Sequence, residues 1–205
     1  MDARGEVCVL NDGKLVRARE EGAMKISLGP PEQRAAQAVL QTLNAALQDE
    51  NGVHAESALT VMGGLIGQSL LMDYREDWSS VGPQFRAVFI EDVNQDLFEC
   101  AQFLNSLLAK RLPGIGAAAA EIPEDHLPHP EALAGVNEGR PVIEDALEAG
   151  EVPAGQKRWV LLFALGELLG MTAAALHPGI GLRLALRAMV RASKTPPAHL
   201  AALEA

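Results

Sequence analysis

The sequence predicts a mostly helical protein. Hydrophobic residues occupy 48% of the 205 positions but aromatic residues only 4%, and alanine and leucine dominate the apolar set. These two residues have high helix propensities, whereas strands favour β-branched and aromatic side chains. Apolar residues also recur at helical spacing in several long segments. We therefore expect a single domain over residues 1–205, built as a compact bundle of about five main helices.

Residues 1–31 form a leader ahead of the first predicted helix. Short apolar stretches flank Asn11-Asp12-Gly13, a turn sequence typical of a β-hairpin. An isolated two-stranded hairpin is marginally stable, so this element must either pack on another part of the chain or stay mobile. The expectation is a short N-terminal hairpin, with the leader ending at Gly29-Pro30-Pro31.

Residues 32–111 form a first helical half. Asn51-Gly52 interrupts the apolar periodicity, and Leu112-Pro113-Gly114 ends it. The residues between these breaks predict three helices, at 32–48, 53–74 and 91–111.

The remainder divides into an irregular acidic connector, 112–155, and a second helical half, 156–205. In the connector, Pro141 is expected at the first position of one short helix that ends before Gly150. In the second half, His177-Pro178-Gly179 separates two predicted helices, at about 156–176 and 180–194.

Two of the predicted helices carry the same glycine spacing. Gly63 and Gly67 lie four apart in the helix at 53–74, and Gly166 and Gly170 lie four apart in the helix at 156–176. Glycine costs about 1 kcal/mol relative to alanine inside a helix, so such a pattern indicates close backbone packing. We expect these two apolar helices to form the centre of the bundle and to cross near their glycines.

Aligning the two glycine pairs places Glu167 opposite Gly64. If the helices cross there, the carboxylate of Glu167 enters a small polar pocket in which Thr60 and Gln68 supply hydrogen-bond donors. A buried carboxylate is costly unless it is paired, hydrogen-bonded or protonated. These residues are therefore a candidate ligand pocket, with Glu167 as general base or anchor. The alternative is a structural acid that is satisfied in the core or faces solvent.

Two polar segments contain most of the histidines. His54 and Glu56 begin the helix at 53–74, but positions i and i+2 of a helix point apart, so we expect Glu56 to stabilise the helix N-terminus instead. Five ionisable residues gather in the connector without matching a known metal template: Glu124, Asp125, His126, His129 and Glu131. No metal site and no cofactor are predicted.

The last predicted helix carries a row of arginines. Arg183, Arg187 and Arg191 lie at positions i, i+4 and i+8, on one face of the helix. Guanidinium groups in this arrangement are a candidate site for an anion or an acidic partner. The alternative is a solvated face, or pairing with the acidic connector.

Charge and motifs exclude several classes of protein. A net charge of -10 and a pI near 4.9 argue against nucleic-acid binding, which needs a basic face. Residues 159–176 are apolar enough to raise the question of a membrane span, but Glu167 at their centre argues against it. Cys8 and Cys100 have neither metal nor redox spacing, as is typical of cytoplasmic thiols. No phosphate-binding loop or nucleophile motif is present, which leaves open whether the chain is an enzyme.

Two function classes follow from these observations. The first is a non-enzymatic cytoplasmic helical protein that acts through self-association, as a homodimer, or through a protein partner. The alternative is a helical protein with a small-molecule pocket at the central crossing around Glu167, and with it an enzymatic activity.

Overall fold

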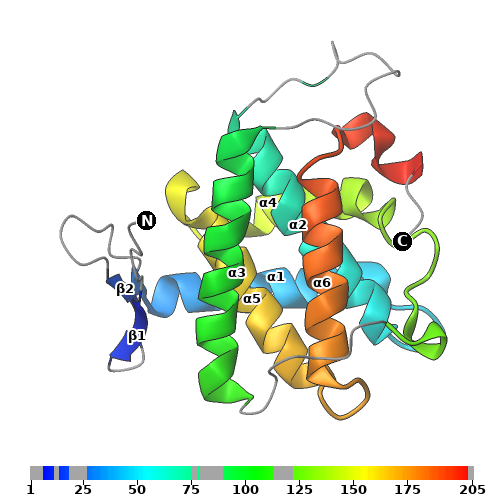
Figure 1. Ribbon diagram of the computed structural model, residues 1–205, viewed down its shortest axis with the longest axis horizontal. Coiled ribbons are helices and arrows are strands. Elements are labelled where there is room, and N and C mark those ends of the chain that lie inside the picture. Colours follow the sequence, from blue (N-terminus) through cyan, green and yellow to red (C-terminus); the bar gives the residue numbers. More distant parts are fainter. Residues whose placement is uncertain are drawn as a thin grey trace.

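The prediction of a mostly helical protein is confirmed. A computed structural model describes residues 7–11, 14–18, 27–74, 78, 90–112 and 122–202. The α-helices within these residues are α1 (Pro30–Leu47), α2 (Ala55–Tyr74), α3 (Glu91–Arg111), α4 (Gly135–Ala149), α5 (Lys157–Thr172) and α6 (Pro178–Ala192) (Figure 1). Three short 3₁₀ helices join or follow them: η1 (Glu124–His126), η2 (Ala154–Gln156) and η3 (Pro197–Ala202).

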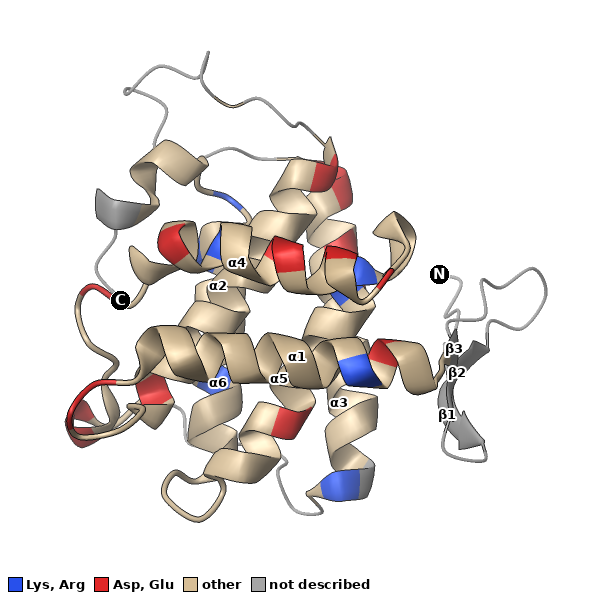
Figure 2. Cartoon of the chain, turned by 180° about the vertical axis from the view of Figure 1, so that it is seen from behind, with Lys and Arg blue, Asp and Glu red and all other residues tan. Residues whose placement is uncertain are grey.

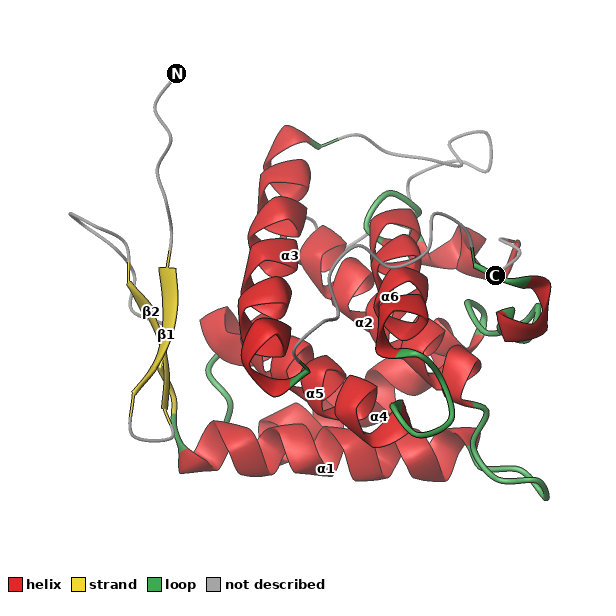
Figure 3. Ribbon diagram, turned by 60° about the horizontal axis from the view of Figure 1, so that its bottom comes forward, coloured by secondary structure: helices red, strands yellow, loops and turns green. Residues whose placement is uncertain are grey.

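Three short strands precede α1: β1 (Val7–Asn11), β2 (Lys14–Ala18) and β3 (Ser27–Leu28). They follow one another in the order β1-β2-β3 with antiparallel pairing (Figure 3). The predicted hairpin turn includes residues 12 and 13, which lie outside the described residues. The hairpin with that turn therefore stays a prediction.

The helices pack in three layers. In the view of Figure 2, α1 and α4 lie side by side in front, while Figure 1 shows α3 and α6 on the opposite face. Between them lie α2 and α5, which contact each other and both outer layers. The middle layer explains the composition of these two helices, because a helix with neighbours on all sides is apolar around its whole circumference.

The two middle helices supply much of the core. Every residue from Ser57 to Gln68 is buried in α2, and every residue from Trp159 to Gly166 is buried in α5. The Trp159 ring packs against Phe103 of α3, with ring centroids 5.1 Å apart. Among the described residues, no helix has the length and apolar character needed to span a membrane.

Helix α4 differs from the prediction. It begins at Gly135, so Pro141 lies inside it rather than at its first position. Proline inside a helix costs about 3 kcal/mol. Here the buried residues Val136, Gly139, Ile143 and Leu147 form one face that continues past the exposed proline. Burial of that face outweighs the lost hydrogen bond, and the predicted irregular connector therefore contains a full helix.

The helix boundaries elsewhere follow local chemistry. Gly52 has a φ of +105°, a left-handed conformation that suits glycine, and it turns the chain between α1 and α2. Helix α6 begins at Pro178, inside the predicted break His177-Pro178-Gly179, because proline suits the first position of a helix. The Nδ1 atom of His177 accepts a hydrogen bond from the backbone N–H of Gly179, at 3.1 Å, and caps this helix.

Candidate functional site

The glycines of α2 pack against α6, not against α5. A Cβ atom added to Gly63 would lie 2.2 Å from the carbonyl oxygen of Ala185, and one added to Gly67 would lie 2.3 Å from that of Met189. Both oxygens belong to the backbone of α6, so these two glycines let the two helices approach more closely than any side chain permits.

The remaining glycines face other neighbours. A Cβ atom at Gly166 would meet Leu107 of α3 at 2.4 Å, and one at Gly64 would meet Val136 of α4 at the same distance. Among the described residues, and apart from the backbone of its own helix, no atom lies within 4 Å of the corresponding position at Gly170. The predicted crossing of the two glycine pairs is therefore wrong, although α2 and α5 do touch. Gly63, Gly67 and Gly166 pack closely against different neighbours, and Gly170 does not share this close packing.

Glu167 is correspondingly not buried at a crossing. It forms an ion pair with Arg111 of α3, and the two side chains are 36% and 33% exposed. The guanidinium of Arg111 also lies over the Phe163 ring, 4.9 Å from its centroid. A partly exposed pair of this kind contributes less than about 1 kcal/mol. The predicted pocket formed by Glu167, Thr60, Gln68 and Gly64 does not form, because Glu167 points towards α3.

Gln68 has a structural role at the end of α6. Its buried Nε2 atom donates hydrogen bonds to the carbonyl oxygens of Ala192, at 2.7 Å, and Thr195, at 2.8 Å. These carbonyls lie where α6 ends and lacks its own helical donors. Gln68 thus ties α2 to the C-terminal end of α6.

Thr60 lies beside two of the arginines of α6. Together with Pro128, Arg187 and Arg191 it lines a small cavity of about 10 Å³, close to the volume that one water molecule requires. The hydroxyl of Thr60 is buried and has no hydrogen-bond partner among the described residues. The structure therefore brings together residues that the sequence placed in two separate candidate sites, but the cavity is too small for an organic ligand.

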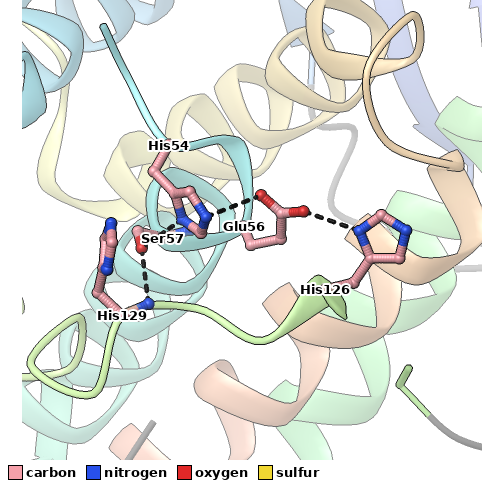
Figure 4. Close-up of polar contacts among 5 residues, drawn as sticks. All are labelled: His54, Glu56, Ser57, His126 and His129. Atoms are coloured by element: carbon pink, nitrogen blue, oxygen red, sulfur yellow. Dashed lines mark hydrogen bonds and ion pairs between the residues drawn. The ribbon is translucent and has the colours of Figure 1, made fainter. Parts of the chain in front are cut away.

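A polar cluster lies at the N-terminal end of α2 (Figure 4). The carboxylate of Glu56 lies between two imidazoles, with its Oε1 atom 2.9 Å from Nδ1 of His126 and its Oε2 atom 3.5 Å from Nε2 of His54. Ser57 follows Glu56 and hydrogen-bonds the ring of His54 and the backbone of His129, and the ring centroids of these two histidines are 4.3 Å apart. We call these five residues the histidine cluster.

Hydrogen bonds within the histidine cluster assign the role of each atom. The backbone N–H of Ser57 donates to Nδ1 of His54, so this nitrogen carries no proton and also accepts from the Ser57 hydroxyl, at 2.9 Å. The proton of the ring is then on Nε2, which faces Glu56. The Ser57 oxygen accepts the backbone N–H of His129 at 3.0 Å.

This arrangement holds a loop rather than a reactive serine. A carboxylate, an imidazole and a hydroxyl in sequence are typical of nucleophilic catalysis. Here, however, the Ser57 side chain is only 7% exposed, and its oxygen already bonds the loop around His129. In the part of the chain that the structure describes, no three His, Cys, Asp or Glu side chains are placed to hold a metal ion. The cluster clamps residues 126–129 onto α2.

The sequence did not predict the histidine cluster. In the sequence, His54 and Glu56 belong to one polar segment, and His126 and His129 belong to another, about seventy residues away. Glu56 does lie in the first turn of α2, as expected for a helix N-terminus. No local pattern relates the two segments, because only the path of the connector across α2 brings them together.

The pKa of Glu56 makes this clamp sensitive to acid. Burial is the largest single influence and raises the pKa of this carboxyl. The His126 hydrogen bond, a backbone hydrogen bond and the two imidazoles together outweigh burial, and the pKa falls below its usual 4.5. Because the folded pKa is depressed, the stabilisation is complete above pH 4.5 and is lost as the pH falls through the lower folded value.

We expect Glu56→Gln to lower the unfolding free energy by about 1 kcal/mol near neutral pH, because one charge-assisted hydrogen bond is lost. The difference from the wild type should shrink as the pH falls through the depressed pKa of Glu56, because the protonated carboxyl no longer carries the charge that glutamine lacks. Urea denaturation at several pH values measures this. Glu91→Gln, at an exposed position in the first turn of α3, serves as the matched control. A Glu56→Gln difference that is constant with pH would contradict the assignment.

The chain was also compared with known proteins. No family model, no curated protein and no solved structure matches it.

Proposed function

We propose that this chain is a non-enzymatic, cytoplasmic helical protein that acts through self-association. The observation that carries the proposal is a pair of oppositely charged stripes on the two outer layers. On α6 the exposed residues Arg183, Arg187 and Val190 follow one another at positions i, i+4 and i+7. We call them the basic stripe.

Helix α4 has a matching surface of the opposite charge. Its exposed residues Glu138, Val142 and Asp145 have the same i, i+4, i+7 spacing, and we call them the acidic stripe. Both valines are large exposed hydrophobic residues, Val142 at 44% and Val190 at 42%. Each stripe thus combines charge with an apolar contact point, which is the composition that a complementary interface requires.

The two stripes do not pair with each other within one chain. The described ion pairs of the α4 carboxylates are formed with Lys157 of α5, by Glu144 at 2.7 Å and by Glu148 at 3.7 Å. Helices α4 and α6 belong to opposite outer layers (Figures 1 and 2). A contact between the basic stripe of one copy and the acidic stripe of another is therefore head-to-tail, and gives a dimer that can extend.

One further feature supports a non-enzymatic protein. The hydroxyl of Ser57 is engaged by the loop that it holds, as described above.

A mixing experiment with two double variants tests the proposal. Arg187→Ala/Val190→Ala removes the basic stripe, and Val142→Ala/Asp145→Ala removes the acidic stripe. Each variant alone should be a monomer by size-exclusion chromatography with light scattering, because each lacks one half of the contact. An equimolar mixture should form a dimer that does not extend, since each partner contributes its intact stripe.

The wild-type mass should rise with concentration and fall with added salt, because the Debye length shortens from about 10 Å at 0.1 M to about 3 Å at 1 M. Phe98→Ala/Met171→Ala changes two exposed hydrophobic residues on α3 and α5 and serves as the control that still associates. A wild type that stays monomeric, or a mixture that stays monomeric, overturns the proposal.

A further inference from the structure

A cavity of about 280 Å³ lies between α2, α4 and the beginning of α5. It is far larger than the space beside Thr60 and reaches the lower end of the range for small-molecule sites, about 300 Å³. Leu65, Met72, Ile143 and Leu161 supply apolar wall. The polar lining comes from Ser69 and from four ionisable residues, whose pairing determines what the cavity can bind.

Two of the ionisable residues neutralise each other. Lys157 donates a hydrogen bond to Glu144 at 2.7 Å, and this bond is the main reason that the pKa of Lys157 is raised. A second carboxylate, Glu148, lies 3.7 Å from the same ammonium. Neither Lys157 nor Glu144 is therefore left to bind a charged ligand.

Arg140 on α4 is not compensated in this way. No carboxylate of the described residues lies within ion-pair distance of it, and its Nη1 atom is buried without a hydrogen-bond partner. Arg140 also lines the cavity. An arginine presents planar paired donors that suit a carboxylate, so a ligand with this group matches Arg140.

Asp73, near the end of α2, is the other uncompensated charge. No described residue pairs with its carboxylate, because the nearby Arg158 is bound to Asp96 at 2.8 Å. Burial is the main cause of the raised pKa of Asp73, and the negative charges of Asp96 and Glu144 add to it, against the opposing effect of Arg158. Asp73 is itself exposed and lines the cavity, so its carboxylate is accessible to a cationic group placed there.

We propose that this cavity binds a small zwitterion of the amino-acid class with an apolar side chain. The carboxylate of the ligand bonds Arg140, its ammonium group bonds Asp73, and its side chain contacts Met72, Ile143 and Leu161. Ser69 offers a hydroxyl to either polar group. The proposal does not depend on self-association, since the stripes and this cavity use different residues.

Isothermal titration calorimetry with matched probes tests it. The probes are L-alanine, L-valine, L-leucine and L-methionine, together with N-acetyl-L-leucine, which lacks the ammonium, and L-leucine methyl ester, which lacks the carboxylate. At least one free amino acid should bind with a dissociation constant below about 1 mM. Both blocked forms of leucine should bind at least about tenfold more weakly than leucine itself.

Variants connect the binding to the two charges. Arg140→Lys keeps the charge but loses the paired donors, and Asp73→Asn keeps the size but loses the charge; each should weaken binding at least about tenfold. Thermal unfolding establishes that both variants fold, and Glu91→Gln, at an exposed position of α3 outside the cavity lining, should bind as the wild type does. Absence of binding by all four amino acids overturns the proposal. So does equal binding of either blocked form, or binding that survives both substitutions.

Discussion

Replacing Gly63 with alanine should destabilise the protein by about 3 kcal/mol, the upper end of the usual cost of overpacking. The added Cβ would lie 2.2 Å from a backbone oxygen of α6 and 2.8 Å from two further backbone atoms of Ala185. Backbone cannot rotate away as a flexible side chain can, so α2 and α6 must separate. The gain of about 1 kcal/mol in helix propensity offsets only part of this cost.

Gly170→Ala is the matched control for this substitution. It changes the glycine that aligns with Gly67 in the sequence, but no described residue outside the backbone of its own helix lies within 4 Å of its Cβ position, and Gly170 is exposed. It should therefore be neutral or should stabilise the protein by up to about 1 kcal/mol. Chemical denaturation measures both variants. If Gly63→Ala were as stable as Gly170→Ala, the close contact between α2 and α6 would be refuted.

Replacing Gln68 with leucine should lower the unfolding free energy by about 2–4 kcal/mol. The substitution removes both hydrogen bonds to the end of α6 and leaves the carbonyls of Ala192 and Thr195 without this buried donor. Each buried polar group that loses its partner costs about 1–3 kcal/mol. The loss should also release the end of α6, which faster hydrogen exchange of the Ser193 and Thr195 amides would report.

Thr60→Val, two turns earlier in α2, removes a buried polar group that, unlike Gln68, makes no described hydrogen bond. The Thr60 hydroxyl is buried and has no hydrogen-bond partner among the described residues, and valine has nearly the same shape. Removing it should leave stability unchanged or raise it by about 1 kcal/mol. A substantial loss of stability in Thr60→Val would mean that the hydroxyl has a bound partner, and would return this residue to the candidate ligand sites.

These two pairs of substitutions separate the roles that the sequence assigned to neighbouring residues of one helix. Gly63, Gly67 and Gln68 connect α2 to α6, whereas Gly64 accommodates a valine of α4. A shared pocket with Glu167, as predicted from the sequence, would require Gly64 and Gln68 to face the same neighbouring helix. A helix in a middle layer has different neighbours on each side, so residues one position apart contact different elements.

The sequence by itself determined the helical class and the positions of most helices, because alanine, leucine, helix-breaking residues and apolar periodicity act within a few turns. It also identified α2 and α5 as the apolar helices, which the structure places in the middle layer. It did not determine the extent of α4, where burial of one face outweighs the local effect of Pro141.

Only the tertiary structure decided which neighbouring helix each of these glycines and polar residues contacts. Glycine spacing indicates that another element packs closely, but it does not identify that element. Gly63 faces α6, whereas Gly166 faces α3. The histidine cluster and the cavity between Arg140 and Asp73 likewise join segments far apart in the chain. Such contacts depend on how whole helices stack, and this stacking is set by the total burial of their faces rather than by any short stretch of residues.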